Sequence, residues 1–173
     1  MNFQLDEAIE VLGNTPNTLE YFLSNLSPGW LECNEGEGTW NAEEVIEHLI
    51  ECEKTNWLPR IKSILEEGGR KPFPPFDRFA HLKEKPEGAM QEKLQQFKSL
   101  RSQNIKTIKA IIIPNLHLEL TGQHPAFGEV KLRELLSTWV VHDLTHISQI
   151  VRVMAARYGE DVGPWREYVS ILK

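Results

Sequence analysis

The segment Trp139-Val-Val-His-Asp-Leu-Thr-His-Ile-Ser-Gln149 decides how the rest of this chain is interpreted. It places His142 and His146 four residues apart, within a run of apolar residues at helical spacing. In a helix, side chains four residues apart leave the same face, about 6 Å from one another along the axis. Two imidazoles placed in this way can bind one metal ion. Paired histidines are also common on plain helix surfaces, so the prediction depends on a third ligand.

A third histidine, His48, lies in a second strongly periodic segment, Asn41-Ala-Glu-Glu-Val-Ile-Glu-His-Leu-Ile50. Three histidines from two helices, with no fourth protein ligand evident, predict a divalent ion that keeps open coordination positions. Open positions are typical of metal sites that take part in chemistry rather than in structural support. Zinc, nickel and iron(II) all suit such a set of imidazoles.

Two acidic side chains are expected beside this site. On a helical wheel, Asp143 projects inward near the two histidines of its helix, and Glu53 lies on the apolar face of the helix that carries His48. A buried carboxylate is unfavourable unless it is paired. It could accept a hydrogen bond from a metal-bound imidazole, pair with an arginine or a tryptophan, or be exposed, and these alternatives stay open. Asp143 also stands where a His-Glu-x-x-His metalloprotease needs glutamate, which argues against peptidase chemistry.

Other side chains near the motifs have less specific interpretations. Cys52 follows His48 by one helical turn and could point at the same ion, but a buried, unreactive thiol is the favoured interpretation. Trp40 and Trp139 are expected to fill the core rather than to line a substrate cavity. Three further histidines are expected in loops and could replace the third ligand with less defined placement: His81, His117 and His124.

The bulk composition excludes several classes of protein. The chain has 173 residues, which suggests a single domain over residues 1–173. Its net charge of −6 argues against a nucleic-acid partner. A small-molecule substrate is the partner expected for an open metal site. Neither a secretory signal nor an apolar run near the ~20 residues of a membrane span is evident. With only Cys33 and Cys52 present, a reduced cytoplasmic protein is the simpler expectation, although a disulfide between them stays open.

Helical periodicity predicts an all-α fold, because convincing strand alternation is absent. A first short helix is expected to end near Gly13, and Thr15-Pro16 is expected to begin the next one as cap and first-turn proline. A helix from the cap Asn41 toward Gly68 should be kinked or broken at Pro59. The apolar faces are best buried in a four-helix bundle with long interhelical loops. The remaining segments are predicted as a loop at 70–86, a helix from Met90 to before Pro114, a loop at 114–131, a helix from Leu132 to Met154 and a short amphipathic end after Gly163.

Two motifs resemble those of the DinB-like superfamily of four-helix metal-binding proteins. They are Thr39-Trp-Asn-Ala-Glu-Glu-Val-Ile-Glu-His-Leu49 and Thr121-Gly-Gln-His-Pro-Ala-Phe-Gly-Glu-Val-Lys-Leu-Arg-Glu-Leu-Leu-Ser-Thr-Trp-Val-Val-His-Asp-Leu-Thr-His-Ile-Ser-Gln-Ile150. The resemblance spans nearly the whole chain and implies a bundle whose metal site maps onto His48, His142 and His146. Lys131 departs from a family pattern that often has threonine as a helix cap, which puts only the start of the last long helix in doubt.

The resemblance also implies a function. Family members with assigned activities look like thiol-dependent transferases that use small cellular thiols such as bacillithiol or mycothiol. We therefore expect a metal-dependent S-transferase that joins a low-molecular-weight thiol cosubstrate to a small electrophile. A metal-dependent hydrolase of a small substrate and a non-catalytic, metal-stabilised binding protein are the alternatives. The family further favours a homodimer.

Overall fold

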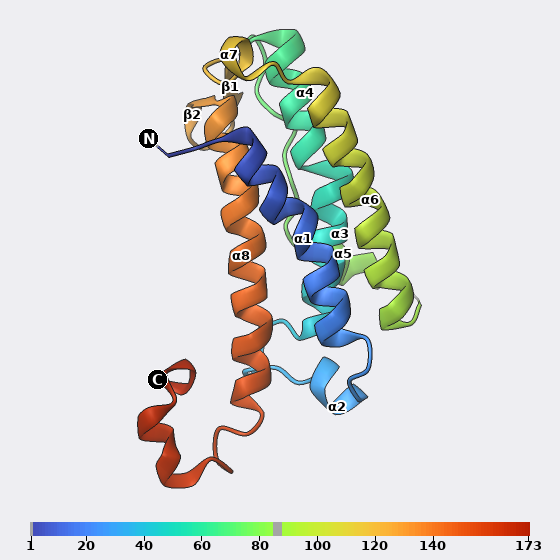
Figure 1. Cartoon of the computed structure of the whole chain (residues 1–173), viewed down its shortest axis with the longest axis vertical. Coiled ribbons are helices and arrows are strands. Elements are labelled where there is room, and N and C mark those ends of the chain that lie inside the picture. The colour runs from blue at the N-terminus through green and yellow to red at the C-terminus, as the bar shows by residue number, and fades with distance from the viewer. Residues whose placement is uncertain (1, 85–87) are drawn as a thin grey trace.

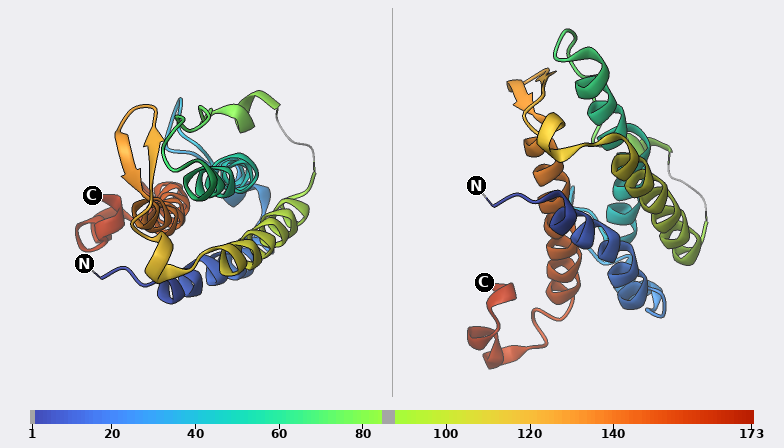
Figure 2. Two further views of the ribbon diagram at one scale, coloured as in Figure 1. Left: turned by 90° about the horizontal axis from the view of Figure 1, so that it is seen from above. Right: turned by 45° about the horizontal axis from the view of Figure 1, so that its top comes forward.

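Four long helical segments form a bundle in the computed structural model, which describes residues 2–84 and 88–173. In the end-on view of Figure 2, α1 and α6 lie on one side of the bundle, and the α3–α4 segment and α8 lie on the other. The all-α four-helix bundle is therefore confirmed. Part of the predicted loop at 70–86, including Pro86, lies outside the described residues. The segments of the bundle are α1 (Leu5–Leu23), α3 (Ala42–Thr55) continued by α4 (Trp57–Glu67), α6 (Met90–Ile111) and α8 (Leu132–Ala156).

The first helix corrects the sequence prediction at Pro16. α1 runs without a break through Gly13, Thr15 and Pro16, so Thr15 is not a cap, and its hydroxyl instead donates to the Val11 carbonyl. A proline inside a helix removes the donor for the carbonyl four residues earlier, which here belongs to Leu12. The Arg101 guanidinium on α6 supplies the missing donor, with Nη1 2.8 Å from the Leu12 oxygen. A partner from another helix therefore lets α1 continue through its proline.

The second segment follows the prediction closely. The Asn41 side chain accepts a hydrogen bond from the Glu44 backbone, and the Glu44 carboxylate accepts one from the Asn41 backbone, which forms a capping box. The helix is interrupted at Asn56, between α3 and α4, three residues before Pro59. Pro59 cannot donate to the carbonyl of residue 55, so the break falls where the α-helical hydrogen bond is missing. Gly68, with a φ of 56°, ends α4 in the left-handed region.

The connections contain more regular structure than the sequence predicted. Residues 114–131 are not a plain loop, because the strands β1 (Thr121–His124) and β2 (Gly128–Lys131) pair as an antiparallel hairpin. Strands of four residues are too short to show alternation in the sequence. The shorter helical elements are α2 (Pro28–Leu31), α5 (Ala80–Glu84), α7 (Pro114–His117) and the 3₁₀ turns η1 (Gly163–Tyr168) and η2 (Ser170–Leu172). The two 3₁₀ turns lie beside the C-terminal end of α8 (Figure 1).

The start of α8 is well defined despite the departure at Lys131. The helix begins at Leu132, and the Glu134 carboxylate accepts a hydrogen bond from the Lys131 backbone at 2.8 Å. This is the N3 half of a capping box, in which the first-turn carboxylate accepts from the backbone N–H of the cap residue and so fixes where the helix begins. No helix in residues 2–84 and 88–173 combines the length and the apolar character needed to cross a membrane.

Two apolar clusters fill the bundle, and a polar layer separates them. One cluster includes Leu12, Ile108 and Trp139, and the other includes Leu19, Phe97 and Ile150. Each of the three helices α1, α6 and α8 therefore contributes to both clusters. Between them lie buried polar side chains from the same helices and from α3, which are Thr15, Glu53, Arg101, Asn104 and Asp143.

Candidate metal centre

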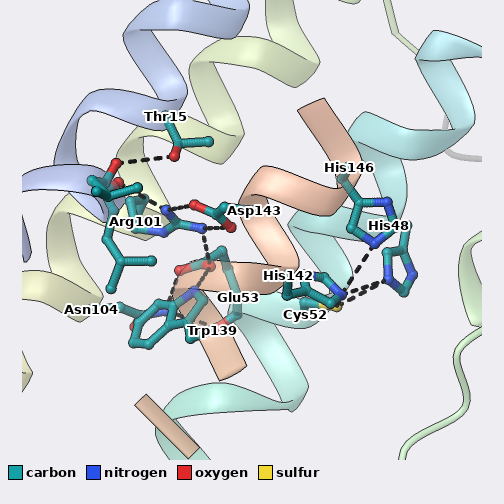
Figure 3. A network of polar contacts seen from close by, with 12 residues as sticks. Thr15, His48, Cys52, Glu53, Arg101, Asn104, Trp139, His142, Asp143 and His146 are labelled. Atoms are coloured by element: carbon teal, nitrogen blue, oxygen red, sulfur yellow. Dashed lines mark hydrogen bonds and ion pairs between the residues drawn. The ribbon is translucent and has the colours of Figure 1, made fainter. Parts of the chain in front are cut away.

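Three imidazoles from two helices converge on one point. His48 comes from α3, and His142 and His146 come from consecutive turns of α8 (Figure 3). The Nε2 atom of His142 lies 3.3 Å from Nε2 of His48 and 3.2 Å from Nε2 of His146. Zinc binds imidazole nitrogens at about 2.0–2.1 Å, so nitrogens of a tetrahedral site lie about 3.3 Å apart. The spacing of the three nitrogens thus fits a shared divalent ion.

The same imidazoles are held in the neutral form that binds metals. Burial, with a smaller contribution from the neighbouring imidazoles, lowers the pKa of His48 and of His142 to about 3. Burial also lowers the pKa of His146. A neutral imidazole offers a nitrogen lone pair, whereas a protonated one cannot bind a cation. The site is therefore ready to bind an ion without first losing protons at neutral pH.

Neighbouring side chains fix how the rings are turned. The Nδ1 atom of His146 is 2.8 Å from the Gln149 side-chain oxygen, so Nδ1 donates and Nε2 is left as the acceptor. Trp57 packs edge-on against His142 with ring centroids 5.1 Å apart, and Trp40 lies 4.9 Å from the His48 ring. These contacts restrict ring rotation and keep the Nε2 atoms directed at one another.

Asp143 and Glu53 do not serve the imidazoles as hydrogen-bond partners, which corrects one of the roles considered for them. Both Asp143 oxygens accept from the Arg101 guanidinium, at 2.6 and 2.9 Å. Glu53 accepts from Arg101 at 2.9 Å, from Asn104 at 2.9 Å and from the Trp139 indole at 3.1 Å (Figure 3). The alternative of a buried pair with arginine or tryptophan therefore describes both carboxylates. They hold α3, α6 and α8 together directly behind the histidines.

The remaining histidines lie outside the trio. His81 is buried on α5, and its ring lies 5.3 Å from that of His48. The prediction that His81 lies in a loop is therefore wrong. His117 lies on α7, where its Nδ1 accepts from the Ile113 backbone. His124 ends β1, and its Nδ1 accepts from the backbone of the following turn. The sequence around His81 did not indicate that this residue packs against His48. α5 is only five residues long, which is too short for a periodic pattern of apolar residues to show.

Cys52 lies directly beside the trio. Its Sγ is 3.5 Å from Nε2 of His48 and 3.9 Å from Nε2 of His142. The side chain is fully buried, and burial raises the pKa of the thiol well above its ordinary range. The residue therefore carries a neutral thiol in this state, in agreement with the expected buried, unreactive cysteine. Both Cys33 and Cys52 are free, so no disulfide joins them.

A cavity of about 810 Å³ opens over the three histidines. Its walls come from the segment before α3, from α3, α4 and α8, and from the hairpin and the segment before α5. Figure 2 places the hairpin and the segment before α5 on the face turned away from α1 and α6. The volume lies at the upper end of the range for small-molecule sites. Trp139 fills the core as predicted, whereas Trp40 is buried and also lines the cavity. Six aromatic side chains contribute to the wall, which are Trp40, Trp57, Phe73, Phe76, Phe79 and Phe127.

Comparisons with known proteins agree with this architecture. Residues 12–150 match the sequence model of the DinB superfamily. The fold is similar to that of YfiT from Bacillus subtilis, described as a probable metal-dependent hydrolase with an unusual four-helix bundle topology. The two structures superpose with a TM-score of 0.76 over 92% of this chain and 90% of YfiT, at 21% sequence identity. No functionally curated protein matches the chain in sequence.

Proposed function

The chain belongs to the DinB superfamily, and we propose that it is a metal-dependent enzyme whose divalent ion is held by His48, His142 and His146. The observation that carries this proposal is the convergence of three neutral imidazole nitrogens at the base of a large cavity. Because all three ligands are neutral, a bound zinc, nickel or iron(II) ion would keep its full charge and favour deprotonation of a thiol or of water. Trp40 packs against the His48 ring and Trp57 against the His142 ring, which keeps these two ligand rings in place.

S-transfer from a small thiol to an electrophile is our first candidate reaction. The cavity volume of about 810 Å³ supports it, because two small reactants can fit side by side over the histidines. The aromatic wall supplies an apolar surface that suits the carbon body of an electrophile. In this reaction the thiol loses its proton, its sulfur forms a bond to the electrophilic carbon, and the leaving group departs with the displaced electron pair.

Hydrolysis of a small substrate is the second candidate, and it is favoured by the similarity to YfiT and its description. The two reactions differ in one measurable requirement. Metal-loaded protein with a panel of electrophiles should consume thiol if it is a transferase, and it should turn over esters or amides without thiol if it is a hydrolase. A protein that gains thermal stability from metal but catalyses neither reaction would contradict the enzymatic proposal and leave a metal-stabilised binding protein.

A spectroscopic titration tests thiol binding directly. Cobalt(II)-loaded protein should develop a sulfur-to-metal charge-transfer band when a small thiol is added at millimolar concentration, and His142→Ala should abolish it. Because Cys52 lies within 4 Å of two ligand atoms, the titration must be repeated with Cys52→Ala. A band that needs added thiol in both proteins supports the transferase proposal. No spectral change at millimolar thiol would favour hydrolysis instead.

We also propose a cytoplasmic homodimer. α8 exposes apolar side chains, including Val141 and Leu144, on its outer surface, and such side chains can form a self-complementary patch. The net charge of −6 does not prevent association. Light scattering should give a mass near 40 kDa, about twice the 19.9 kDa of one chain. A 20 kDa species at high micromolar concentration would exclude the dimer, and Leu144→Glu should produce that species if the patch is correct.

A further inference from the structure

A polar strip leads from the histidines along one wall of the cavity. His48, Cys52, Asn56 and Arg60 follow one another at intervals of four residues, so they lie on one face of α3 and its continuation α4. The break at Asn56 does not interrupt this face, because the Arg60 backbone donates to the Asn56 carbonyl at 3.4 Å. His48, Asn56 and Arg60 line the same cavity. At 1.5 Å per residue, Arg60 begins about 18 Å from His48 along the helices.

Asn56 presents an unused polar group to this wall. The side chain is only 5% exposed, and its Oδ1 atom is buried without a hydrogen-bond partner. A buried polar group without a partner costs about 1–3 kcal/mol, so it calls for an explanation. Rotation of the amide interchanges its oxygen and nitrogen, so the group can donate or accept as a ligand requires. An absent ligand is the explanation that its position on the cavity wall supports.

Arg60 presents an unpaired positive charge one helical turn further on. The side chain is half-buried, and none of the ion pairs within residues 2–84 and 88–173 includes it. Its guanidinium lies 5.5 Å from the centre of the Phe73 ring, which holds it against an aromatic wall. By contrast, Arg152 on the same cavity is neutralised by Glu35 at 2.7 Å. A guanidinium in this state is suited to bind a carboxylate through two hydrogen bonds.

We propose that Asn56 and Arg60 form a second binding point of the cavity, which holds the carboxylate of a small molecule. The apolar body of this molecule lies against two rings of the cavity wall: Trp57, whose ring is 5.1 Å from that of His142, and Phe73, whose ring is 5.5 Å from the Arg60 guanidinium. Its other end reaches the three histidines, and this last assignment rests on the proposed function. The substrate class is thus a small carboxylic acid with an apolar or aromatic body. The overall acidity of the chain does not oppose it, because recognition depends on the local charge of Arg60, which takes part in none of the ion pairs of the described residues.

Binding by metal-free protein tests the proposal without any contribution from the ion. After treatment with chelator, the affinities of 4-phenylbutyrate and of its neutral amide are compared by titration calorimetry or by quenching of tryptophan fluorescence. The two probes share size and shape, so the difference between them measures the charge. We expect the carboxylate to bind about tenfold more tightly, which is the effect of a typical charge-assisted hydrogen bond. Arg60→Gln should abolish this preference and leave the affinity for the amide nearly unchanged.

Two further variants complete the test. Lys62→Gln removes one positive charge from the exposed face of the same helix and should keep the tenfold preference. Asn56→Ala should reduce the affinity for the carboxylate several-fold. This variant replaces Arg60→Gln in the test if Arg60→Gln does not fold. Equal affinity for the two probes in the wild-type protein, or a preference that survives in Arg60→Gln, would overturn the proposal. The binding test uses metal-free protein, so its result does not depend on whether the metal-loaded protein is catalytically active. A failure of the proposed function and a failure of this proposal can therefore be told apart.

Discussion

At the scale of single residues, the histidines differ in how far the sequence determines them. His142 and His146 share a face of one uninterrupted helix, so their spacing alone brings them together. His48 joins them only because α3 packs against α8, and that packing arises from apolar faces spread over the whole chain. The sequence could therefore predict the pair from local pattern, and the third residue only through the bundle and the family resemblance.

The metal assignment predicts the behaviour of single histidine variants. Replacement of His48, His142 or His146 by alanine removes one of three ligands, so each variant should lose stoichiometric metal while remaining helical. His117→Ala is the control, because that side chain only accepts from the Ile113 backbone. Elemental analysis and far-ultraviolet circular dichroism provide the two readouts. Stoichiometric metal in the triple-alanine protein would show that the ion binds elsewhere.

The carboxylates illustrate what local pattern cannot determine. Asp143 and Glu53 were expected to be buried and to need partners, and both are fully buried. Their partner, Arg101, lies 42 and 48 residues away in the sequence. Nothing in the sequence around Arg101 distinguishes it from a surface arginine on an amphipathic helix. Burial could thus be inferred from periodicity, whereas the choice between imidazole and guanidinium as partner required the packing of α6.

Arg101→Met should be strongly destabilising. It leaves two buried carboxylates without their positively charged partner and the Leu12 carbonyl without its donor, and breaking a buried pair in this way costs about 3–5 kcal/mol. Lys98→Met, one turn earlier on the same helix, removes a partly exposed pair with Glu20 and should cost less than about 1 kcal/mol. Urea unfolding measures both free energies. Similar values for the two variants would mean that the polar layer contributes little to stability.

At the scale of elements, the sequence prediction differs most from the structure at the hairpin, because residues 114–131 were predicted as a loop. The hairpin packs against α4 and against the segment that follows α4. Phe73 donates its backbone N–H to the Gln123 carbonyl at 2.8 Å, and its ring fills the space over Gly122. The hydrogen bond joins residues fifty positions apart in the sequence, so no local pattern predicts it. The helix cap at Asn41 and the break before Pro59 were predictable because their causes lie within a few residues.

Two glycine substitutions should change stability in opposite directions. A Cβ atom at Gly122 would lie 2.5 Å from the Phe73 ring and 2.7 Å from Ile64, so Gly122→Ala should destabilise by about 1–3 kcal/mol. A Cβ atom at Gly13 meets nothing closer than 3.8 Å, and Gly13 lies inside α1. Gly13→Ala should therefore stabilise by up to about 1 kcal/mol. Chemical denaturation of both variants checks the pair, and destabilisation by Gly13→Ala would contradict the view that α1 is an ordinary helix at this point.

At the scale of the whole molecule, the bundle and the metal site depend on different contacts. Two apolar clusters and the layer around Arg101 join all four helical segments, whereas the three histidines join only α3 and α8. The cavity lies on the opposite side of α3 and α8 from α1 and α6, so ligands can enter without opening the core. The chain is thus expected to fold before it binds its ion.

Metal removal should lower the stability of the protein without unfolding it. An ion that binds only the folded state stabilises by about 2.7 kcal/mol when its free concentration is a hundred times its dissociation constant. For a chain of this size that free energy corresponds to a Tm shift of roughly 5–10 °C. Calorimetry should therefore give one cooperative transition for metal-free protein, lower by that amount, with the shift absent in His146→Ala. A metal-free chain without a cooperative transition would contradict this view. It would mean that the buried contacts of the bundle are not enough to keep the protein folded, and that the ion is needed for folding.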